Sequence, residues 1–389
     1  MQPLPSEIAL THSRLVQEMI RKKIVAANHW ISFADYMNLA LYAPGMGYYS
    51  SGATKLGHAG DFVTAPEISP LFGRTLAQQL TQILQPMAPA DILEFGAGSG
   101  KLARDILLEL EKSDALPRKY YILEVSPDLR QRQQTLLAEE VPHLTHRIEW
   151  LDQLPRQFNG IMLANEVLDA MPAHIVRWHD DAVLERGVAW QDNRFTWQDR
   201  PIEDAQLQTV ASELTAEINP DNQPVDYVSE INLAAARFIH SLASTLQQGV
   251  VLLIDYGFGR SEYYHPQRNQ GTLMCHYRHH AHDDPFYLPG LQDITCHVDF
   301  SALTQAAENT GLKLLGYTTQ AYFLLNCGIT DLLAQTSAED IHHYLAQSNQ
   351  LQKLVSPAEM GELFKTIAFG KNFFEPLRGF NTGDMSRLL

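Results

Sequence analysis

A glycine-rich turn at residues 94–100 carries the residue types and spacing best suited to chemistry in this sequence. It reads Glu-Phe-Gly-Ala-Gly-Ser-Gly, follows an apolar run over 91–95 that predicts a buried strand, and precedes a helix predicted over 101–112. Glycine lets a backbone turn tightly and approach a ligand without a Cβ clash. The unpaired N–H groups at the start of a helix are available to a polar or anionic group. We therefore expect a ligand site here, with a purely structural tight turn as the alternative.

The spacing of the glycines discriminates among nucleotide-like ligands. A phosphate-binding P-loop requires G-x-x-x-x-G-K-[ST], but Phe95 and Leu102 stand where that pattern needs a glycine and a hydroxyl. The dinucleotide pattern G-x-G-x-x-G needs glycine at position 101, which is Lys101. The observed acidic-x-G-x-G-x-G pattern instead resembles motif I of the class I methyltransferases, which implies S-adenosylmethionine as cofactor. The residues of the turn expected to bind it are Glu94, Gly96, Ala97, Gly98 and Gly100.

Carboxylates follow the next two predicted strands. Glu124 ends a strand predicted over 120–124, at the distance from the turn where an acidic side chain accepts hydrogen bonds from ribose hydroxyls. Val125 and Ser126 come directly after it and are expected beside the cofactor. Asp152 follows a strand predicted over 147–150 and is a candidate for contact with adenine, with an ordinary surface aspartate as the alternative.

A polar segment follows the fourth predicted strand, 160–164. Because ligands of open α/β sheets bind beyond the carboxyl ends of the strands, we expect Asn165 to lie beside the cofactor and Glu166, Asp169 and His174 to lie where a methyl acceptor approaches. Two nearby carboxylates suit a guanidinium group, which they can hold by paired, charge-assisted hydrogen bonds. The alternative is that Glu166 caps a helix and Asp169 solvates it.

The alternation of strands and helices from residue 91 to 164, with a further strand over 250–255, predicts an α/β fold with a parallel sheet. Helices are also expected over 7–27, 33–41 and 72–84, and the end of the chain suggests a helix over 330–348 and a last strand near 364–369. We expect an N-terminal helical segment with a Gly/Pro-rich loop over 1–85. A core over 86–389 should follow, with a polar inserted subdomain near 180–230 and an irregular insertion near 257–298.

Composition narrows the possible partners. The 389 residues carry a formal net charge of −16, which disfavours nucleic acid and fits a cationic partner better. No apolar run reaches the length of a membrane-spanning helix, and no signal or presequence is visible, so a cytoplasmic protein is expected. A homo-oligomer stays open. The three cysteines are widely spaced and predict free thiols rather than disulfides or a zinc site. The histidine-rich run over 276–282 is more readily explained by surface polarity than by a metal.

Several stretches together resemble the MidA-type methyltransferases, a family that includes the mitochondrial complex I assembly factor. They include Gly47-Tyr48-Tyr49, the run Gly60 to Ser69, Phe72-Gly73, Glu94 to Gly100, Asn165 to Pro172 with His174, Asp255-Tyr256-Gly257, Gly271-Thr272-Leu273, Pro289-Gly290, and Asp293 to Phe300. The run over 60–69 is far more specific than the glycine turn. The segment 274–277, Met-Cys-His-Tyr, departs from the arginine-containing version expected after Gly-Thr-Leu.

The resemblance implies a class I, Rossmann-like methyltransferase with a mostly parallel sheet and helices on both faces. It also implies methylation of an arginine in a protein, with a respiratory complex I subunit as the acceptor in mitochondria. The run over 60–69 then becomes a candidate lid: Asp61, Thr64 and Pro66 would contact the cofactor, and Glu67 would line the acceptor channel. Two alternatives are kept: a scaffold protein that binds the cofactor without essential catalysis, and a methyltransferase acting on a small molecule.

Overall fold

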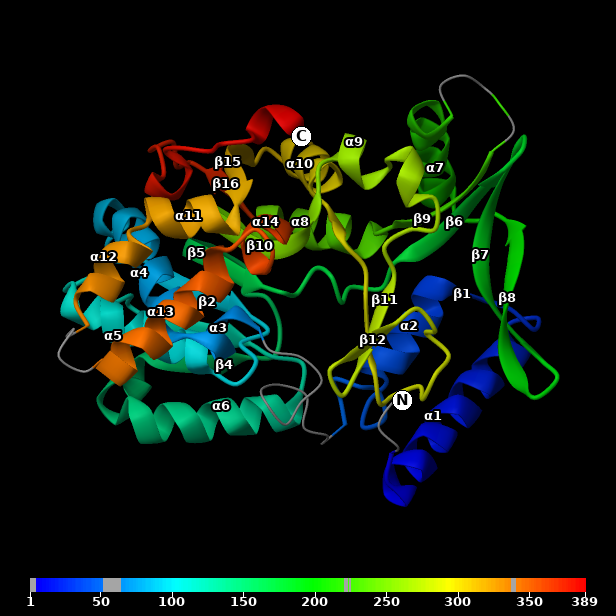
Figure 1. The fold of residues 1–389 in the computed structure, drawn as a ribbon, viewed down its shortest axis with the longest axis horizontal. Helices are drawn as coiled ribbons and strands as arrows, with labels where there is room; N and C mark the ends of the chain where they lie inside the picture. The colour runs from blue at the N-terminus through cyan, green and yellow to red at the C-terminus, as the bar shows by residue number, and fades with distance from the viewer. Residues whose placement is uncertain (1–4, 52–63, 220–222, 224, 337–340) are drawn as a thin grey trace. The chain divides into compact units, whose positions relative to one another are not determined.

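The computed structural model describes residues 5–51, 64–219, 223, 225–336 and 341–389 (Figure 1). The chain forms two compact units. Unit 1 comprises Met1–Phe62, Leu168–Arg237 and Phe258–Asp299, and unit 2 comprises Val63–Val167, Phe238–Gly257 and Phe300–Leu389. Both units are therefore discontinuous in sequence.

A mostly parallel sheet forms the centre of unit 2. Its strands are β2 (Asp91–Phe95), β3 (Tyr120–Leu123), β4 (Ile148–Leu151), β5 (Phe158–Asn165), β10 (Leu246–Phe258), β15 (Lys313–Thr319) and β16 (Phe364–Lys371). They lie in the order β15-β16-β10-β5-β2-β3-β4. The strands from β10 to β4 are parallel, and β16 is antiparallel to both of its neighbours. This arrangement confirms the predicted Rossmann-like α/β sheet.

The helices of unit 2 connect and cover these strands. They are α3 (Ala65–Ile68), α4 (Pro70–Leu84), α5 (Lys101–Lys112), α6 (Pro127–Glu140), α10 (Phe300–Glu308), α11 (Gln320–Asn326), α12 (Ile329–Ala334), α13 (Ile341–Val355) and α14 (Met360–Leu363), together with the end of α8 (Leu233–Thr245) and the short 3₁₀ turns η1 (Gln85–Met87), η2 (Pro142–Arg147), η4 (Arg378–Phe380) and η5 (Ser386–Leu388). From β2 the chain passes through α5 and α6 toward one edge, and from β5 it passes through α8 toward the other edge. Right-handed crossovers therefore place these connections on opposite faces, with the switch point between β2 and β5.

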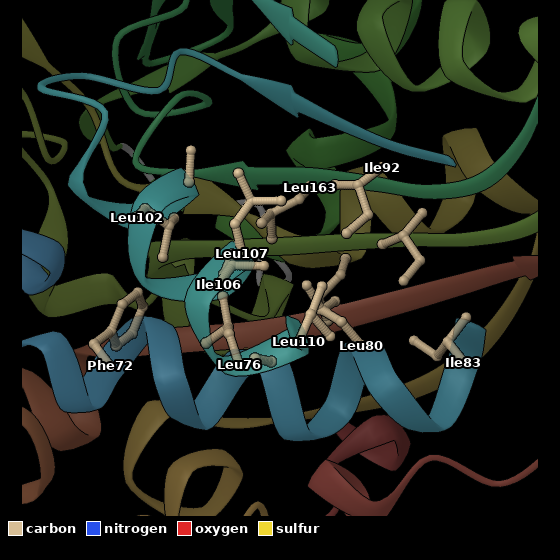
Figure 2. Close-up of a cluster of buried hydrophobic side chains, with 14 of the residues drawn as sticks. Phe72, Leu76, Leu80, Ile83, Ile92, Leu102, Ile106, Leu107, Leu110 and Leu163 are labelled. Carbon is tan, nitrogen blue, oxygen red and sulfur yellow. The ribbon is translucent and has the colours of Figure 1, made fainter. Parts of the chain in front are cut away.

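Leucine and isoleucine side chains from α4 and α5 build one layer of the unit 2 core (Figure 2). Leu76 and Leu80 of α4 lie beside Ile106 of α5, and Ile92 of β2 lies above them (Figure 2). All four side chains are fully buried. Burial of each such side chain contributes roughly 1.5–3 kcal/mol. This layer therefore fixes α5, which begins directly after the glycine turn.

Unit 1 combines helices with antiparallel sheets. Its elements are α1 (Glu7–Ala26), β1 (Ile31–Ser32), α2 (Phe33–Tyr42), β6 (His174–His179), β7 (Ala182–Gln191), β8 (Arg194–Pro201), α7 (Ala205–Ile218), β9 (Asp226–Ile231), the start of α8, α9 (Arg260–Tyr263), η3 (Pro266–Arg268), β11 (Met274–Tyr277), β12 (His280–His282), β13 (Asp293–Thr295) and β14 (Val298–Asp299). One sheet has the order β1-β7-β6-β9, with β8 also paired to β7, and a smaller sheet has the order β12-β11-β13. The apolar stripe of α1, formed by Val16, Ile20 and Ile24, is fully buried in the core of this unit.

The polar stretch near 180–230 contributes β7, β8 and β9 to the main sheet of unit 1, and it lies between two segments of unit 2 in the sequence. Two sequence expectations differ from the structure. The stretch near 257–298 contains β11, β12 and β13 rather than irregular backbone alone. The helix over 330–348 is not continuous, because α12 ends at Ala334 and α13 begins at Ile341. Polar residues on the outer faces of these antiparallel strands weaken the apolar pattern on which such expectations depend.

The domain boundary expected near residue 85 also differs from the observed division. Helices α3 and α4 pack with α5 and belong to unit 2, although they precede the glycine turn. Among the described residues, no helix is long and apolar enough to cross a membrane.

Candidate active site

The glycine turn follows the carboxyl end of β2, one of the two strands that flank the switch point. Gly96, Gly98 and Gly100 have φ values of +61°, +55° and +89°, a region that side-chain-bearing residues rarely adopt. The Gly96 N–H donates to the carbonyl of Leu123 over 3.0 Å, which ties the turn to β3. A Cβ on Gly96 would stand 3.1 Å from the Cγ2 of Val167. The turn is therefore tightly enclosed by its neighbours.

Glu94 lies buried just before the turn, with 2% of its surface exposed. Its carboxylate accepts a hydrogen bond of 2.7 Å from the hydroxyl of Tyr120 on β3. Burial raises the pKa of Glu94 to about 7; the Tyr120 hydrogen bond opposes this rise, and the nearby charge of Glu124 adds to it. Glu94 thus joins β2 to β3, and its direct contact with a cofactor stays a prediction.

Glu124 presents a half-buried carboxylate directly after β3. One oxygen accepts from the Ser126 N–H over 2.9 Å, and the other accepts from the side-chain amide of Gln133 over 2.9 Å. Ser126 is fully buried and caps α6, whereas Val125 exposes 64% of its surface. Glu124 thus presents its carboxylate at the carboxyl end of β3, and its hydrogen bonds to ribose hydroxyls stay a prediction.

Asp152 follows β4 and forms an ion pair of 2.5 Å with Arg130 of α6. The Asp152 side chain is 85% exposed, so this pair contributes little to stability. Its carboxylate is accessible, and contact with adenine stays a prediction.

Glu67 of α3 is tied to the glycine turn. One carboxylate oxygen accepts from the Ser99 hydroxyl over 2.5 Å, and the other pairs with the Lys101 ammonium over 2.6 Å. The Glu67 side chain is only 8% exposed. A carboxylate held in this way anchors α3 to the start of α5 and is less available as a base in the reaction. This geometry favours positioning over proton transfer for Glu67.

Thr64 and Pro66 lie just before Glu67, at the start of α3. Thr64 is the N-cap of α3, and its backbone carbonyl accepts from the Glu67 N–H over 2.9 Å. Pro66 occupies the first turn of this helix, where a missing N–H costs little. Asp61, the other lid residue expected from the sequence, lies outside the described residues.

The segment after β5 has an unusual backbone. Glu166 adopts a φ of +54°, and its N–H donates to the carbonyl of Ile254 on β10 over 2.9 Å. The buried Asp255 accepts from the Val167 N–H over 3.2 Å and so holds the following residue. A non-glycine residue in this conformation costs on the order of 1–3 kcal/mol, and such residues cluster at functional sites.

Asn165 lies beside Glu166 and donates to its carboxylate over 3.0 Å. The carbonyl oxygen of the Asn165 side chain is buried and has no hydrogen-bond partner in the part of the chain that the structure describes. A buried acceptor without a partner costs about 1–3 kcal/mol, which a ligand carrying a donor would recover. Together with the glycine turn and the Glu124 carboxylate, this acceptor fits an adenosyl amino acid.

Asp169 and His174 belong to unit 1. Asp169 is 6% exposed, and its backbone carbonyl accepts from the Cys296 N–H over 2.9 Å. The Nδ1 atom of His174, at the start of β6, lies 2.7 Å from a carboxylate oxygen of the buried Glu185 on β7. Among the described residues, unit 2 therefore holds those assigned to the cofactor together with Glu166 and Glu67, while unit 1 holds Asp169 and His174.

The Gly271-Thr272-Leu273 stretch surrounds a buried carboxylate in unit 1. Glu230 of β9, 2% exposed, accepts hydrogen bonds from the backbone N–H groups of Thr272 and Leu273. A Cβ on Gly271, whose φ is +77°, would stand 2.3 Å from a Glu230 oxygen. The contacts with Glu230 thus explain the residue types of this stretch without a ligand.

Sequence reasoning missed several residues of the site: Ser99, Lys101, Gln133, Trp150, Glu185 and Asp255. Lys101 served only to exclude the dinucleotide pattern, and Gln133 carries no motif because its partners are distant in sequence. Within the described ranges, no group of three or more His, Cys, Asp or Glu side chains is arranged to hold a metal.

The sheet order, the glycine turn beside its switch point and the carboxylate after the next strand together define a class I methyltransferase fold. A family model described as "Putative S-adenosyl-L-methionine-dependent methyltransferase" matches residues 71–318. This match spans most of the sheet and the whole of the glycine turn.

Curated relatives match nearly the whole chain. "Protein arginine methyltransferase NDUFAF7, mitochondrial" from Danio rerio is 30% identical over 91% of this chain and 86% of its own length. The NDUFAF7 homolog from Drosophila melanogaster is 29% identical over 94% of this chain and 87% of its own length.

A solved structure agrees with the fold throughout. A protein from Burkholderia thailandensis, crystallised with S-adenosyl-homocysteine, shares 47% identity with a TM-score of 0.95, and each chain covers 100% of the other. The chain therefore belongs to the family of S-adenosylmethionine-dependent methyltransferases that the family model describes, and the NDUFAF7 proteins are its relatives. The resemblance predicted from the sequence motifs is thereby confirmed, and S-adenosylmethionine is the cofactor.

Proposed function

We propose that this chain methylates an arginine side chain of a protein. The observation that carries the proposal is its similarity over nearly the full length to proteins named as arginine methyltransferases. The strained Glu166 supports it, because a carboxylate at the carboxyl end of β5 suits a guanidinium. A respiratory complex I subunit as acceptor follows only from the resemblance and belongs to the proposal.

The cofactor half of the site uses backbone and carboxylate groups of unit 2. Bound S-adenosylmethionine supplies an electrophilic methyl group for an in-line displacement. The backbone of the turn at Gly96 and Gly98 would approach its amino-acid part, Gly100 lets α6 pack against the turn, and Glu124 would accept from the ribose hydroxyls. The exposed Val125 and Asp152 would border adenine. Thr64 and Pro66 would lie against it, with Glu67 bracing the turn, and Asp61 stays a candidate from the sequence alone.

The acceptor half would hold and deprotonate a guanidinium. Glu166 would accept hydrogen bonds from its N–H groups and leave one nitrogen aimed at the methyl group. Methyl transfer to nitrogen releases a proton, which a general base must accept. Asp169 and His174 of unit 1 stay candidates for the second carboxylate and for this base from their place in the sequence after β5. A hydrogen bond from Nδ1 of His174 to Glu185 would leave Nε2 as an acceptor.

The test is incubation of the purified chain with radiolabelled S-adenosylmethionine and lysate of cells that lack it. We expect label on arginine of one or a few proteins. Glu166→Gln should lower the labelling rate by roughly 10²–10³-fold while cofactor affinity is kept, because the lost charge acts in the transition state. Glu139→Gln, an exposed change on α6, is the matched control.

Two results would contradict this proposal. Label found only on a small molecule would reject the protein acceptor. A Gly98→Trp variant that binds no cofactor yet restores the phenotype of a deletion would favour the scaffold alternative over catalysis.

We also propose a protein partner rather than nucleic acid, and action in the cytoplasm. The net charge of −16 supports the first point, since it repels phosphate backbones. Three buried free cysteines, Cys275, Cys296 and Cys327, are in keeping with a reducing compartment. Fractionation of cells with a detected tag tests the location, and recovery with mitochondria or membranes would reject it.

A further inference from the structure

Gln133 of α6 joins three parts of the cofactor site, although no motif contains it. Its side-chain nitrogen donates to the carbonyl of Gly98 over 3.0 Å and to the Glu124 carboxylate over 2.9 Å. Its side-chain oxygen accepts from the indole N–H of Trp150 on β4 over 3.0 Å. Gln133 is fully buried. All the polar capacity of one side chain is thus used between the glycine turn and two successive strand ends.

The orientation of this amide is fixed by its partners. An indole N–H can only donate, and a backbone carbonyl and a carboxylate can only accept. The oxygen of Gln133 must therefore face Trp150, and the NH₂ group must face Gly98 and Glu124. A flipped amide would lose all three hydrogen bonds at once.

Helix α6 lies close enough to the turn for this contact because of Gly100. A Cβ on Gly100 would stand 3.3 Å from the Cα of Gln133 and 3.4 Å from a methyl group of Leu136. The third glycine of the motif therefore faces α6 rather than open space. It allows the backbone of α6 to approach the turn, and the Gln133 amide then spans the remaining gap.

We propose that Gln133 is the residue that positions Glu124 for the ribose and so determines selectivity for a cofactor with ribose hydroxyls. The Ser126 N–H holds one Glu124 oxygen and Gln133 holds the other, which fixes the plane of the carboxylate. A carboxylate held in one plane loses less conformational freedom when it accepts from the two hydroxyls of a ribose. This inference rests on the cofactor part of the proposed function and is independent of the acceptor.

Calorimetry with two ligands tests the inference: S-adenosylhomocysteine and its analogue that lacks both ribose hydroxyls. Gln133→Leu should weaken binding of S-adenosylhomocysteine by roughly 10–100-fold, the loss expected for a hydrogen bond to a charged group. The same variant should bind the analogue as tightly as the unmodified chain does, because Glu124 then has no hydroxyl to hold. A purely structural role would weaken both ligands equally.

Two further variants keep the test decisive. Gln131→Leu, an exposed change on the same helix, should bind both ligands normally. Trp150→Phe keeps an aromatic ring at this partly buried position but removes the donor that orients Gln133. If Gln133→Leu does not fold, Trp150→Phe should weaken binding of S-adenosylhomocysteine selectively.

The inference is overturned if Gln133→Leu and Trp150→Phe leave the affinity for S-adenosylhomocysteine unchanged, or if they weaken the analogue as much. Failure of the unmodified chain to bind S-adenosylhomocysteine would also overturn it. Loss of arginine labelling with normal ligand binding would instead count only against the proposed acceptor, so the two failures are distinguishable.

Discussion

Replacement of Glu94 by glutamine should remove a pH dependence that this buried carboxyl imposes on the stability of unit 2. Glu94 is 2% exposed and contacts the hydroxyl of Tyr120. Glutamine keeps the shape of the side chain and an oxygen for that hydroxyl, but it does not titrate. The comparison of Glu94→Gln with the unmodified chain therefore isolates the titration of one group.

The magnitude follows from the pKa of Glu94, which burial raises from 4.5 to about 7. Because the folded chain holds this proton more tightly than the unfolded chain, the stabilisation is complete below about pH 4.5 and is lost as the pH rises through about 7. At roughly 1.4 kcal/mol per pKa unit, the full loss is about 3 kcal/mol. The charged carboxylate is thus tolerated at high pH only at the expense of stability.

Urea unfolding at several pH values measures this effect. We expect the stability of Glu94→Gln relative to the unmodified chain to rise by about 2–3 kcal/mol between about pH 5 and pH 8. Tyr120→Phe should move the midpoint of the unmodified chain's pH dependence upward, because the Tyr120 hydrogen bond lowers the pKa of Glu94. Parallel pH curves for Glu94→Gln and the unmodified chain would refute the reasoning.

Three further predictions concern positions where the backbone or burial is decisive. Gly96→Ala should destabilise unit 2 by about 1–2 kcal/mol in urea unfolding, because its φ of +61° disfavours a Cβ that would also touch Val167; an unchanged midpoint would contradict this. Gly271→Ala should destabilise unit 1 by more than about 2 kcal/mol, because its Cβ would overlap the carboxylate of Glu230 and the left-handed conformation disfavours alanine. An unchanged midpoint of thermal unfolding for this variant would contradict the close contact between Gly271 and Glu230. The three cysteines should resist Ellman's reagent at mildly alkaline pH until urea unfolds the chain, because burial raises their pKa values, that of Cys327 to about 12; rapid reaction of the folded chain would show that the thiols are accessible.

The parallel part of the fold was predictable because it is local. The strand Asp91–Phe95 and the helix Lys101–Lys112 have the bounds that the sequence predicted. A short buried run, three glycines and an apolar stripe suffice to specify a strand, a turn and a helix. The match over the first four parallel strands follows from the same kind of signal.

The antiparallel sheet of unit 1 was not predictable in this way. Strands β7 and β8 alternate polar and apolar residues only weakly, and β8 carries Asp199, which accepts from Arg177 and Arg186. Ion pairs on the face of a sheet remove the polarity contrast on which a sequence pattern depends. The sequence pattern therefore does not indicate these strands, although they build most of the main sheet of unit 1.

The candidate site shows the same division between local and distant contacts. Glu94, Glu124 and Asn165 were identified because each stands a short, fixed distance from a strand end. The partners of Glu67 lie 32 and 34 residues further along the chain, and no spacing rule relates them. The contact between Glu67 and the glycine turn is therefore visible only in the tertiary structure.

By itself, the sequence determined the cofactor class, because a ligand that binds along a strand–turn–helix unit is specified by residues that are neighbours in the chain. Only the tertiary structure decided which side chains hold those residues in place. The Gln133 amide, the Asp255 carboxylate and the Glu185 partner of His174 act across distant segments, where the geometry of hydrogen bonds is set by packing and not by sequence separation.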